Sequence, residues 1–341
     1  MTRTLPAARR GFLRTAMTVA AAVTFGAGLA GQASAQETLR LSHQWSTNDI
    51  RHKVAQIIAD EVEKADVGLK IQIFPSQSLF KARDQWGAAS SGRLDMMVLP
   101  LSYAGGRHPE FNLTLMPGLV KNHAHAKRIN ESAFMDEIEK IANANGVVTV
   151  AKGWLAGGFA STGKCIRQPD DVQGMQMRAA GKAFEQMLAG AGASIASMPS
   201  SEAYNALQTG VIDALNTSSS SFVSYRIYEQ VKCYTPAADY ALWFMYQPVM
   251  MSKRAYDNLN DAQKAALAAA SEKAEAYYAE EGAKEDATSI DVFKKAGIEI
   301  ALMTEADFNA WRKLAEQTSY KAFNEEVKGG QKLLDLALSV D

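Results

Sequence analysis

One arginine of the chain stands where it could bind an anion. Arg178 ends the strand-like stretch 174–178 and is followed by the small residues 179–181. A guanidinium at the end of a strand presents a planar set of donors that fits a carboxylate with two parallel hydrogen bonds. We therefore expect Arg178 to bind the carboxylate of a small ligand. The alternative is a surface arginine paired with an acid.

The sequence contains none of the common catalytic or nucleotide-binding patterns. There is no G-x-S-x-G, no H-E-x-x-H, no P-loop and no paired C-x-x-C. Because no nucleophile and base can be nominated, we expect a binding protein without a cofactor rather than an enzyme. An exported enzyme that acts on a small carboxylate is the distant alternative.

Three histidines could take part in a site. His123 and His125 could contact a metal, but side chains two residues apart at the start of a helix point in different directions. We expect surface histidines there and predict no metal site. His43 ends the first predicted strand, where α/β folds place loops that face a ligand, so it is a candidate ligand-binding residue. A hydrogen-bonded loop histidine explains it equally well.

Several aromatic residues fall in segments that we expect to face a ligand cleft. Aromatic walls favour a ligand with an apolar or planar body. We therefore expect a monocarboxylate with a hydrophobic or aromatic portion rather than a small dicarboxylate. The alternative is that these rings belong to the hydrophobic core. The residues are Trp45, Trp154, Phe159, Tyr240, Trp243 and Phe244.

The first 35 residues have the features of an export signal. Arg9 and Arg10 are followed by a Phe-Leu-basic triplet, which the Tat exporter reads, and a short apolar run leads to the A-x-A pattern at 33–35. We expect cleavage near Gln36 and a periplasmic mature chain. An uncleaved membrane anchor is the alternative, although the apolar run is short for a span.

The expected mature chain is mildly acidic and long enough for two cores. Without the four arginines of the signal it has 32 basic and 37 acidic residues, a net charge of −5. This balance argues against a nucleic-acid partner. Its 306 residues exceed the size at which single cores stop growing. Cys165 and Cys233 could form a disulfide in an oxidising compartment, or could be two buried free thiols.

The chain alternates strand-like and helix-like segments, which predicts an α/β fold with mostly parallel strands. In the first of the helices, Val54, Ile57, Ile58, Glu61 and Val62 mark a stripe at helical spacing, and Ser201 is expected to cap a later one. We expect strands at 38–43, 69–74, 94–99, 147–154, 175–178, 194–196, 211–215 and 247–252, and helices at 49–65, 82–91, 181–190 and 201–210.

One predicted helix is much longer than the rest. Asn260 can cap it, Gln263 lies three residues later, and the residues to about 295 are rich in Ala, Glu and Lys. A helix of this length measures about 50 Å, more than one small lobe, so it should bridge two lobes. A break near Gly282 is the alternative.

The segment 170–213 resembles the extracytoplasmic solute receptors of TRAP transporters. Their pattern has a D-x-x-G strand that ends in arginine, then S-E-x-Y-x-A-L-Q-x-G and V-x-D. The matching residues are Asp171, Gly174, Met175, Met177, Arg178, Ser201, Glu202, Tyr204, Ala206, Leu207, Gln208, Gly210, Val211 and Asp213. The stretches 74–80, which contains Gln77, and 92–99 also match, so the resemblance covers nearly the whole mature chain.

The resemblance implies a two-lobed periplasmic binding protein whose lobes close on a carboxylate clamped by Arg178. It further implies a long helix across the hinge and docking on the small and large membrane subunits of a permease. We assign 36–155 plus about 243–285 to the first lobe and about 156–242 plus 286–341 to the second, and expect a monomer. A receptor of an ATP-driven importer is the main alternative.

Two departures from the family pattern limit the transfer of site residues. The region 157–160 has no arginine where sialic-acid receptors have a second one. After V-x-D this chain has Asn216 and Thr217 instead of the usual Gly-Gln-Glu-Asn-Pro segment. Asn216, Thr217 and Gln77 nevertheless join the ligand-binding candidates, because their side chains can form hydrogen bonds.

Overall fold

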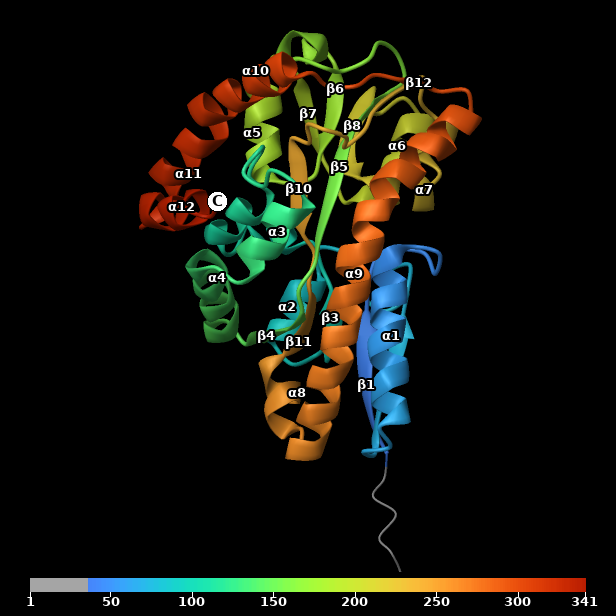
Figure 1. Ribbon diagram of the computed structural model, residues 1–341, viewed down its shortest axis with the longest axis vertical. Helices are drawn as coiled ribbons and strands as arrows, with labels where there is room; N and C mark the ends of the chain where they lie inside the picture. The colour runs from blue at the N-terminus through green and yellow to red at the C-terminus, as the bar shows by residue number, and fades with distance from the viewer. Residues whose placement is uncertain (1–35) are drawn as a thin grey trace, which may run out of the picture. The chain divides into compact units, whose positions relative to one another are not determined.

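The computed structural model describes residues 36–341, which form one compact unit built on two β-sheets (Figure 1). The predicted export signal lies outside the described residues. We call each sheet with its covering helices a lobe. The α/β class and the two-lobed arrangement are confirmed.

The first lobe is built on a five-stranded sheet in the order β2-β1-β3-β11-β4. β1 runs parallel to β2 and β3, whereas β11 runs antiparallel to β3 and β4. The strands are β1 (Glu37–Ser42), β2 (Leu69–Phe74), β3 (Met96–Val98), β4 (Val147–Ala151) and β11 (Val249–Ser252), and the helices are α1 (Ile50–Lys64), α2 (Gln85–Ser90) and α8 (Lys253–Asn258).

The second lobe is built on a seven-stranded sheet in the order β12-β9-β5-β8-β6-β7, with β10 also paired to β5. β6 runs parallel to β7 and β8, and β5 runs antiparallel to β8, β9 and β10. The strands are β5 (Trp154–Ser161), β6 (Gln176–Ala179), β7 (Ser194–Ser197), β8 (Ala214–Ser218), β9 (Cys233–Thr235), β10 (Trp243–Tyr246) and β12 (Glu299–Ile300), and the helices are α5 (Lys182–Gly190), α6 (Ala203–Gln208) and α7 (Ser219–Ser224).

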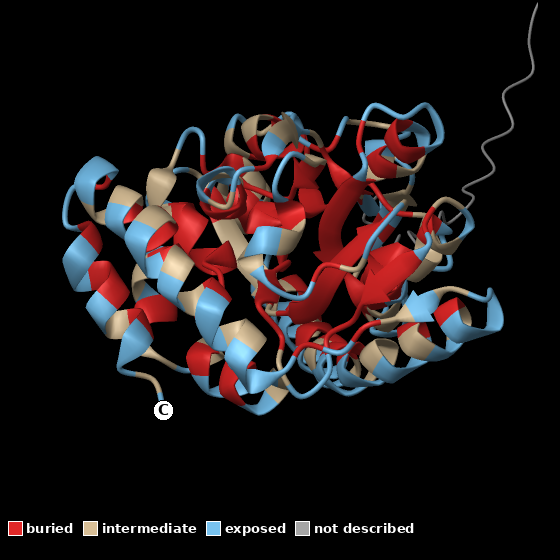
Figure 2. Ribbon diagram, turned by 90° about the horizontal axis from the view of Figure 1, so that it is seen from above, coloured by how far each residue is buried: buried red, intermediate tan, exposed pale blue. Residues whose placement is uncertain are grey.

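A group of further helices packs around α5 and shares one large apolar core with it. Figure 2 shows the buried strands inside and the exposed helix faces outside. The remaining helical segments are η1 (Leu101–Ala104), η2 (Pro109–Leu115), α3 (His123–Asn130), α4 (Ala133–Ala144), η3 (Pro169–Val172), η4 (Ser200–Glu202), η5 (Ile227–Glu229), α10 (Glu305–Ala315), η6 (Glu316–Tyr320), α11 (Lys321–Glu326) and α12 (Gly330–Leu338).

Two short segments carry the chain between the sheets. Residues 152–153 join β4 to β5, and residues 247–248 join β10 to β11. The backbone N–H of Gln247 donates to the carbonyl of Gly153 at 2.8 Å, so the two crossings lie side by side. The prediction of one strand over 147–154 is wrong, because the chain changes sheets at Gly153. A Cβ there would lie 1.9 Å from the ring of Tyr278, which explains the glycine.

The third crossing is the long helix α9 (Asp261–Lys295), whose 35 residues run beside α1 in Figure 1. Asn260 caps it, and Gln263 completes the predicted capping box. Leu267 and Tyr278 are buried in the core of the first lobe, and Phe293 is buried in that of the second. The prediction of one unbroken helix across both lobes is confirmed.

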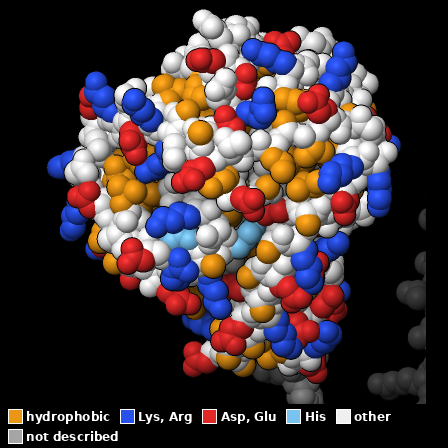
Figure 3. All heavy atoms as spheres, turned by 45° about the horizontal axis from the view of Figure 1, so that its top comes forward, with side chains coloured by type: hydrophobic (Ala, Val, Ile, Leu, Met, Phe, Trp, Pro, Cys, Tyr) orange, Lys and Arg blue, Asp and Glu red, His pale blue; other side chains and the backbone are white. Residues whose placement is uncertain are grey.

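The exposed faces carry charges of both signs. On the face in Figure 3, basic and acidic side chains are interspersed around small apolar groups. Many pair within one helix, as Lys284 does with Glu280 and Glu281 at 2.7 Å. Exposed pairs of this kind contribute at most about 1 kcal/mol each, so they do not determine how the lobes are arranged.

Three local expectations need correction. Ser201 does not cap α6, because the chain first forms η4, whose Ser200 N–H donates to the hydroxyl of Tyr103. The strand expected at 211–215 lies at 214–218 instead, because residues 209–211 still complete the end of α6. In α1 the buried face includes Val54, Ile58 and Val62 and leaves Ile57 and Glu61 half-buried.

The two cysteines form a disulfide. Cys165 and Cys233 are bonded, with their Cα atoms 5.2 Å apart. The bond ties the loop after β5 to the start of β9. Disulfide sulfurs are not available as metal ligands, so the cluster of these cysteines with Glu299 is not a metal site.

Candidate ligand-binding site

A small enclosed cavity lies between the two lobes, where the carboxyl ends of parallel strands meet. Its first-lobe wall follows β1 and β3, and its second-lobe wall follows β6 and β8. In α/β folds such strand ends are the usual place for a ligand. Its volume is about 10 Å³, close to the minimum for one water molecule. Any molecule larger than water therefore does not fit this cavity with the lobes as they stand.

Arg178 lies in this cavity, with only 1 % of its surface exposed. Its guanidinium donates from Nε to the carbonyl of Met198 at 3.0 Å and from Nη1 to the carbonyl of Asn216 at 2.6 Å. Nη2 donates to the hydroxyl of Tyr103 at 3.0 Å. A guanidinium has five N–H groups, so one N–H on each Nη is left for a ligand.

All three acceptors of Arg178 are uncharged. Burial therefore lowers the pKa of Arg178 below its usual value, and the nearby Tyr103 offsets this effect in part. Burial alone would raise the pKa of the Tyr103 hydroxyl, but the positive charge of Arg178 and the hydrogen bonds from neighbouring groups such as Ser200 together lower it. A buried cation without a counter-ion is costly. This arrangement favours an anion beside Arg178.

A second arginine, Arg51, lines the same cavity from the first lobe. Asp49 accepts from its Nε and Nη2, both at 2.6 Å, and both side chains are buried. The other donors of Arg51 reach the second-lobe hydroxyls of Ser218, Ser220 and Ser221 and the side-chain oxygen of Gln247 at 2.8–3.1 Å. The guanidinium thus has as many acceptors as it can use.

Asp49 and Arg51 hold each other in their charged forms. Burial opposes both charges, but the ion pair raises the pKa of Arg51 above its usual value and lowers that of Asp49. The hydroxyl of Ser224 also donates to Asp49 at 2.6 Å. Burial and the neighbouring His52 lower the pKa of His43 to about 3, so His43 is neutral at physiological pH.

Three side-chain N–H groups around the cavity lack a hydrogen-bond partner within residues 36–341. They are Asn216 Nδ2, Trp243 Nε1 and Gln247 Nε2. Buried donors of this kind are uncommon in folded proteins, because leaving one unpaired costs about 1–3 kcal/mol. Together with the free N–H groups of Arg178 they form a set of donors that suits a ligand rich in oxygen.

A second small cavity shares Trp243 with the first. Its other walls include Phe159, Tyr240 and Met303, and its volume is also about 10 Å³. Phe159 stacks on Trp311 with the ring centroids 5.5 Å apart. Trp243 is thus shared by a cavity with mostly polar walls and one with mostly apolar walls.

The structure places the sequence-predicted residues in three groups. Arg178, Thr217 and Trp243 line the polar cavity, and the backbone carbonyl of Asn216 holds Arg178. Phe159 and Tyr240 line the apolar cavity. Neither cavity is lined by Phe244, which was also expected to face the cleft, or by the remaining candidates His43, Trp45, Gln77 and Trp154.

Those four residues have structural contacts elsewhere. His43 pairs with His52 at 3.0 Å and accepts from the backbone N–H of Trp45, whose ring lies 4.0 Å from the Arg51 guanidinium carbon. Gln77 accepts from the N–H of Ala82 within its own loop. Trp154 faces an outer groove between α3 and α9.

Sequence reasoning missed Asp49, Arg51 and Tyr103. One signal was present for Arg51, because it lies three residues before Val54 on the buried face of α1. A basic residue in the first turn of a helix also opposes the helix dipole. Tyr103 follows β3 in a 3-10 turn and carries no comparable pattern.

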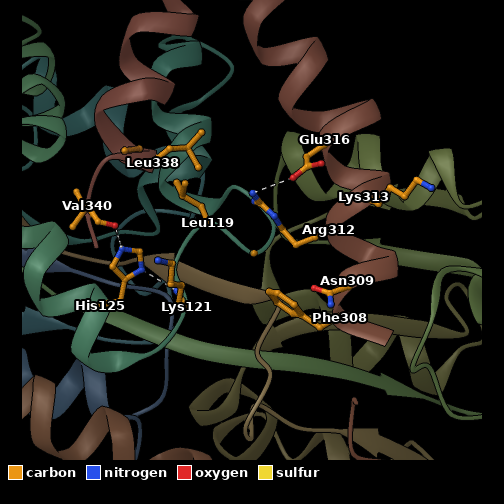
Figure 4. A pocket seen from close by; sticks show the side chains of 12 residues that line it. Leu119, Lys121, His125, Phe308, Asn309, Arg312, Lys313, Glu316, Leu338 and Val340 are labelled. Atoms are coloured by element: carbon orange, nitrogen blue, oxygen red, sulfur yellow. Dashed lines mark hydrogen bonds and ion pairs between the residues drawn. The ribbon is translucent and has the colours of Figure 1, made fainter. Parts of the chain in front are cut away.

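Two larger pockets on the protein surface are less suited to an anion than the interlobe cavity. The pocket in Figure 4 has a volume of about 460 Å³ and lies against α10, but its Arg312 and His125 already have partners. Arg312 lies 3.3 Å from Glu316, and His125 bonds to Val340 and Lys121. The expectation of a surface position is wrong for His125, which is buried because it packs under the C-terminal residues.

The groove beside Trp154 is about 730 Å³ and carries several carboxylates, among them Glu272, Glu275 and Glu280. Burial raises the pKa of Glu275. His123 binds Asp286 at 2.7 Å at one end of this region. Its acidic lining makes it a poor place for an organic anion.

Comparison with known proteins identifies the chain. The sequence profile of the bacterial extracellular solute-binding proteins, family 7, matches residues 41–326. The chain belongs to this family. A solute-binding protein of Albidiferax ferrireducens is 37 % identical over 305 residues, which cover 88 % of this chain and 90 % of that protein. The 2,3-diketo-L-gulonate-binding periplasmic protein of Escherichia coli is 26 % identical and covers 92 % of this chain and 96 % of its own length.

Solved structures agree in fold. A TRAP periplasmic solute-binding protein from Rhodoferax ferrireducens with bound malonate superposes with a TM-score of 0.86 at 36 % identity, over 89 % of this chain and 98 % of its own. An extracytoplasmic solute receptor of Bordetella pertussis that binds pyroglutamic acid superposes with a TM-score of 0.81 at 21 % identity. The match covers 88 % of this chain and 99 % of that chain. Family 7 proteins of this type are solute receptors of TRAP transporters, not enzymes. Within residues 36–341 no helix is long and apolar enough to cross a membrane.

Proposed function

We propose that this TRAP receptor captures an organic acid in the interlobe cavity, with the ligand carboxylate held by Arg178. The observation that carries the proposal is the pair of unused N–H groups on a buried guanidinium that has no acidic partner among residues 36–341. Two charge-assisted hydrogen bonds typically contribute about 1.5–3 kcal/mol each. The free donors of Asn216, Trp243 and Gln247 would orient the remaining oxygens.

The ligand in this proposal is a monocarboxylate with an apolar or aromatic body. Phe159, Tyr240 and Trp243 supply apolar surface in the cavity that shares Trp243 with the polar one. A ligand that spans both small cavities would place its carboxylate at Arg178 and its body against these rings.

Closure of the lobes completes the proposed capture. Its hinge consists of the two crossings at Gly153 and Gln247 together with α9. Because β10 belongs to the sheet of the second lobe, we move the lobe boundary expected at about 242 to the crossing at 247–248, and we keep those at about 155 and 285 as part of the proposal. The receptor would work as a monomer in the periplasm and deliver its ligand to the small and large membrane subunits of a TRAP permease.

A thermal-shift screen of residues 36–341 against aliphatic and aromatic organic acids tests this proposal. Binding at one hundred times Kd stabilises a protein by about 2.7 kcal/mol, which a melting curve detects. Arg178→Ala should abolish the shift, while the unliganded variant remains folded. Arg312→Ala is the matched control, since it removes a guanidinium from the pocket of Figure 4 and should leave the shift unchanged. An undiminished shift in Arg178→Ala would overturn the proposal.

A further inference from the structure

Two arginines line one cavity, but only one of them has a counter-ion. Among the lining residues, Arg51 and Arg178 are the charged ones within the described chain. Asp49 binds Arg51 through both carboxylate oxygens, whereas the acceptors of Arg178 are two carbonyls and a phenol. The cavity wall therefore carries one uncompensated positive charge rather than two.

The ion pair is fixed in place from both lobes. The hydroxyl of Ser224 and the backbone N–H of Arg51 donate to Asp49, and serines of the run 218–221 accept from Arg51. Neither partner is exposed by more than 1 %. A ligand carboxylate that replaced Asp49 on Arg51 would leave the Asp49 carboxylate buried and unpaired, which is strongly unfavourable.

We infer that Asp49 is a specificity-determining residue: by neutralising Arg51 it restricts the cavity to a ligand with one negative charge. The inference rests on the proposed function, because it takes Arg178 as the carboxylate clamp. A second carboxylate on the ligand would enter the closed cavity without a free cation to receive it, and desolvation of that charge would weaken binding. A neutral second group of the same shape would not meet this cost.

A pair of probes that differ by one charge tests the inference. Malonate and malonamate have nearly the same shape, but malonamate carries a carboxamide in place of one carboxylate. Malonate is the dicarboxylate of choice because it is bound in the similar Rhodoferax ferrireducens protein. Titration calorimetry at about pH 8, far above carboxylate pKa values, gives the ratio of the two dissociation constants. The unmodified protein should bind malonamate at least about tenfold more tightly.

Two single variants should shift this ratio in opposite directions, and two further variants serve as controls. Asp49→Asn keeps an N-cap oxygen but frees the charge of Arg51, so the ratio should move at least about tenfold toward malonate. Arg51→Gln leaves Asp49 unpaired and should move the ratio further toward malonamate. The double variant Asp49→Asn with Arg51→Gln removes both charges and should restore the original preference. Ser224→Ala, which removes a hydrogen bond without a charge, should leave the ratio unchanged.

Each outcome decides the inference. Tighter binding of malonate by the unmodified protein, or an unchanged ratio in Asp49→Asn, would overturn it. Where Asp49→Asn does not fold, the opposite shift in Arg51→Gln and its reversal in the double variant provide the same test. Failure of the clamp itself appears separately, as binding that survives Arg178→Ala. The ratio compares the dissociation constants of two probes on one protein sample. A loss of folded protein affects both measurements alike, so it does not change the ratio.

Discussion

The two walls of the interlobe cavity each contain a buried arginine, but in opposite situations. Arg51 has an acceptor for every donor, including both oxygens of Asp49. Arg178 has three uncharged acceptors and two unused N–H groups. The pKa values move accordingly, since that of Arg51 is raised by its partner and that of Arg178 is lowered by burial. Burial of a charge alone does not mark a binding site; incomplete pairing does.

The same difference assigns separate tasks to the two regions. The Asp49–Arg51 pair reaches from α1 to the serines of the second lobe, so it holds the lobes together when they are closed. Arg178 is held within the second lobe by Asn216 and Met198, and from the first lobe by Tyr103. We therefore expect changes at Arg51 to affect mainly stability and changes at Arg178 to affect mainly ligand affinity.

Removal of each guanidinium in turn gives the largest expected contrast. Arg51→Met leaves Asp49 buried without a partner, and the free energy of unfolding should fall by about 3–5 kcal/mol. Arg178→Met leaves no unpaired charge and should cost at least about 2 kcal/mol less. Urea denaturation of the unliganded proteins measures both values. Equal losses in the two variants would mean that the walls do not differ in the way described.

The pH dependence of the free energy of unfolding tests whether the His43 side chain is uncharged in the folded protein. His43 has a pKa of about 3 when folded, against about 6.5 in an unfolded chain, so only the unfolded state binds a proton between these values. Its contribution to stability is complete above about pH 6.5 and is lost as the pH falls toward 3. The slope should reach about 1.4 kcal/mol per pH unit and decrease in His43→Gln. An identical slope in that variant would assign the protonation to other groups.

The smallest expected effect comes from the support of Arg178. Tyr103→Phe removes the hydroxyl that accepts from Arg178 and from the N–H of Ser200. The loss of these bonds should weaken ligand binding by about 1–2 kcal/mol, or roughly fivefold to thirtyfold. Tyr204→Phe, which removes an exposed phenol bonded to Glu229, is the control. If both variants bind alike in calorimetry, Tyr103 does not position the guanidinium.

The sequence predicted features that depend on local pattern. The capping box of Asn260 and Gln263 and the Ala-rich run gave α9 with nearly correct ends. The strand-end arginine and its small neighbours pointed to Arg178, which does lie in the cavity. Both depend on interactions within a few residues of the chain, which spacing and composition can express.

Features that depend on distant partners were not predictable in this way. The strand expected at 147–154 is divided because Tyr278, far along the chain, occupies the space beside Gly153. Phe159 and Trp243 share a cavity because β5 and β10 pair, and no local pattern specifies that pairing. Arg51 was overlooked because its acceptors include Ser218 and Gln247, which are more than 150 residues away in sequence.

A crystal structure of residues 36–341 with the acid found by the thermal-shift screen tests the central claim most directly. We predict that one carboxylate accepts hydrogen bonds from Nη1 and Nη2 of Arg178, while Arg51 remains paired with Asp49. A carboxylate bound to Arg51, or one beyond hydrogen-bond distance of Arg178, would contradict the account.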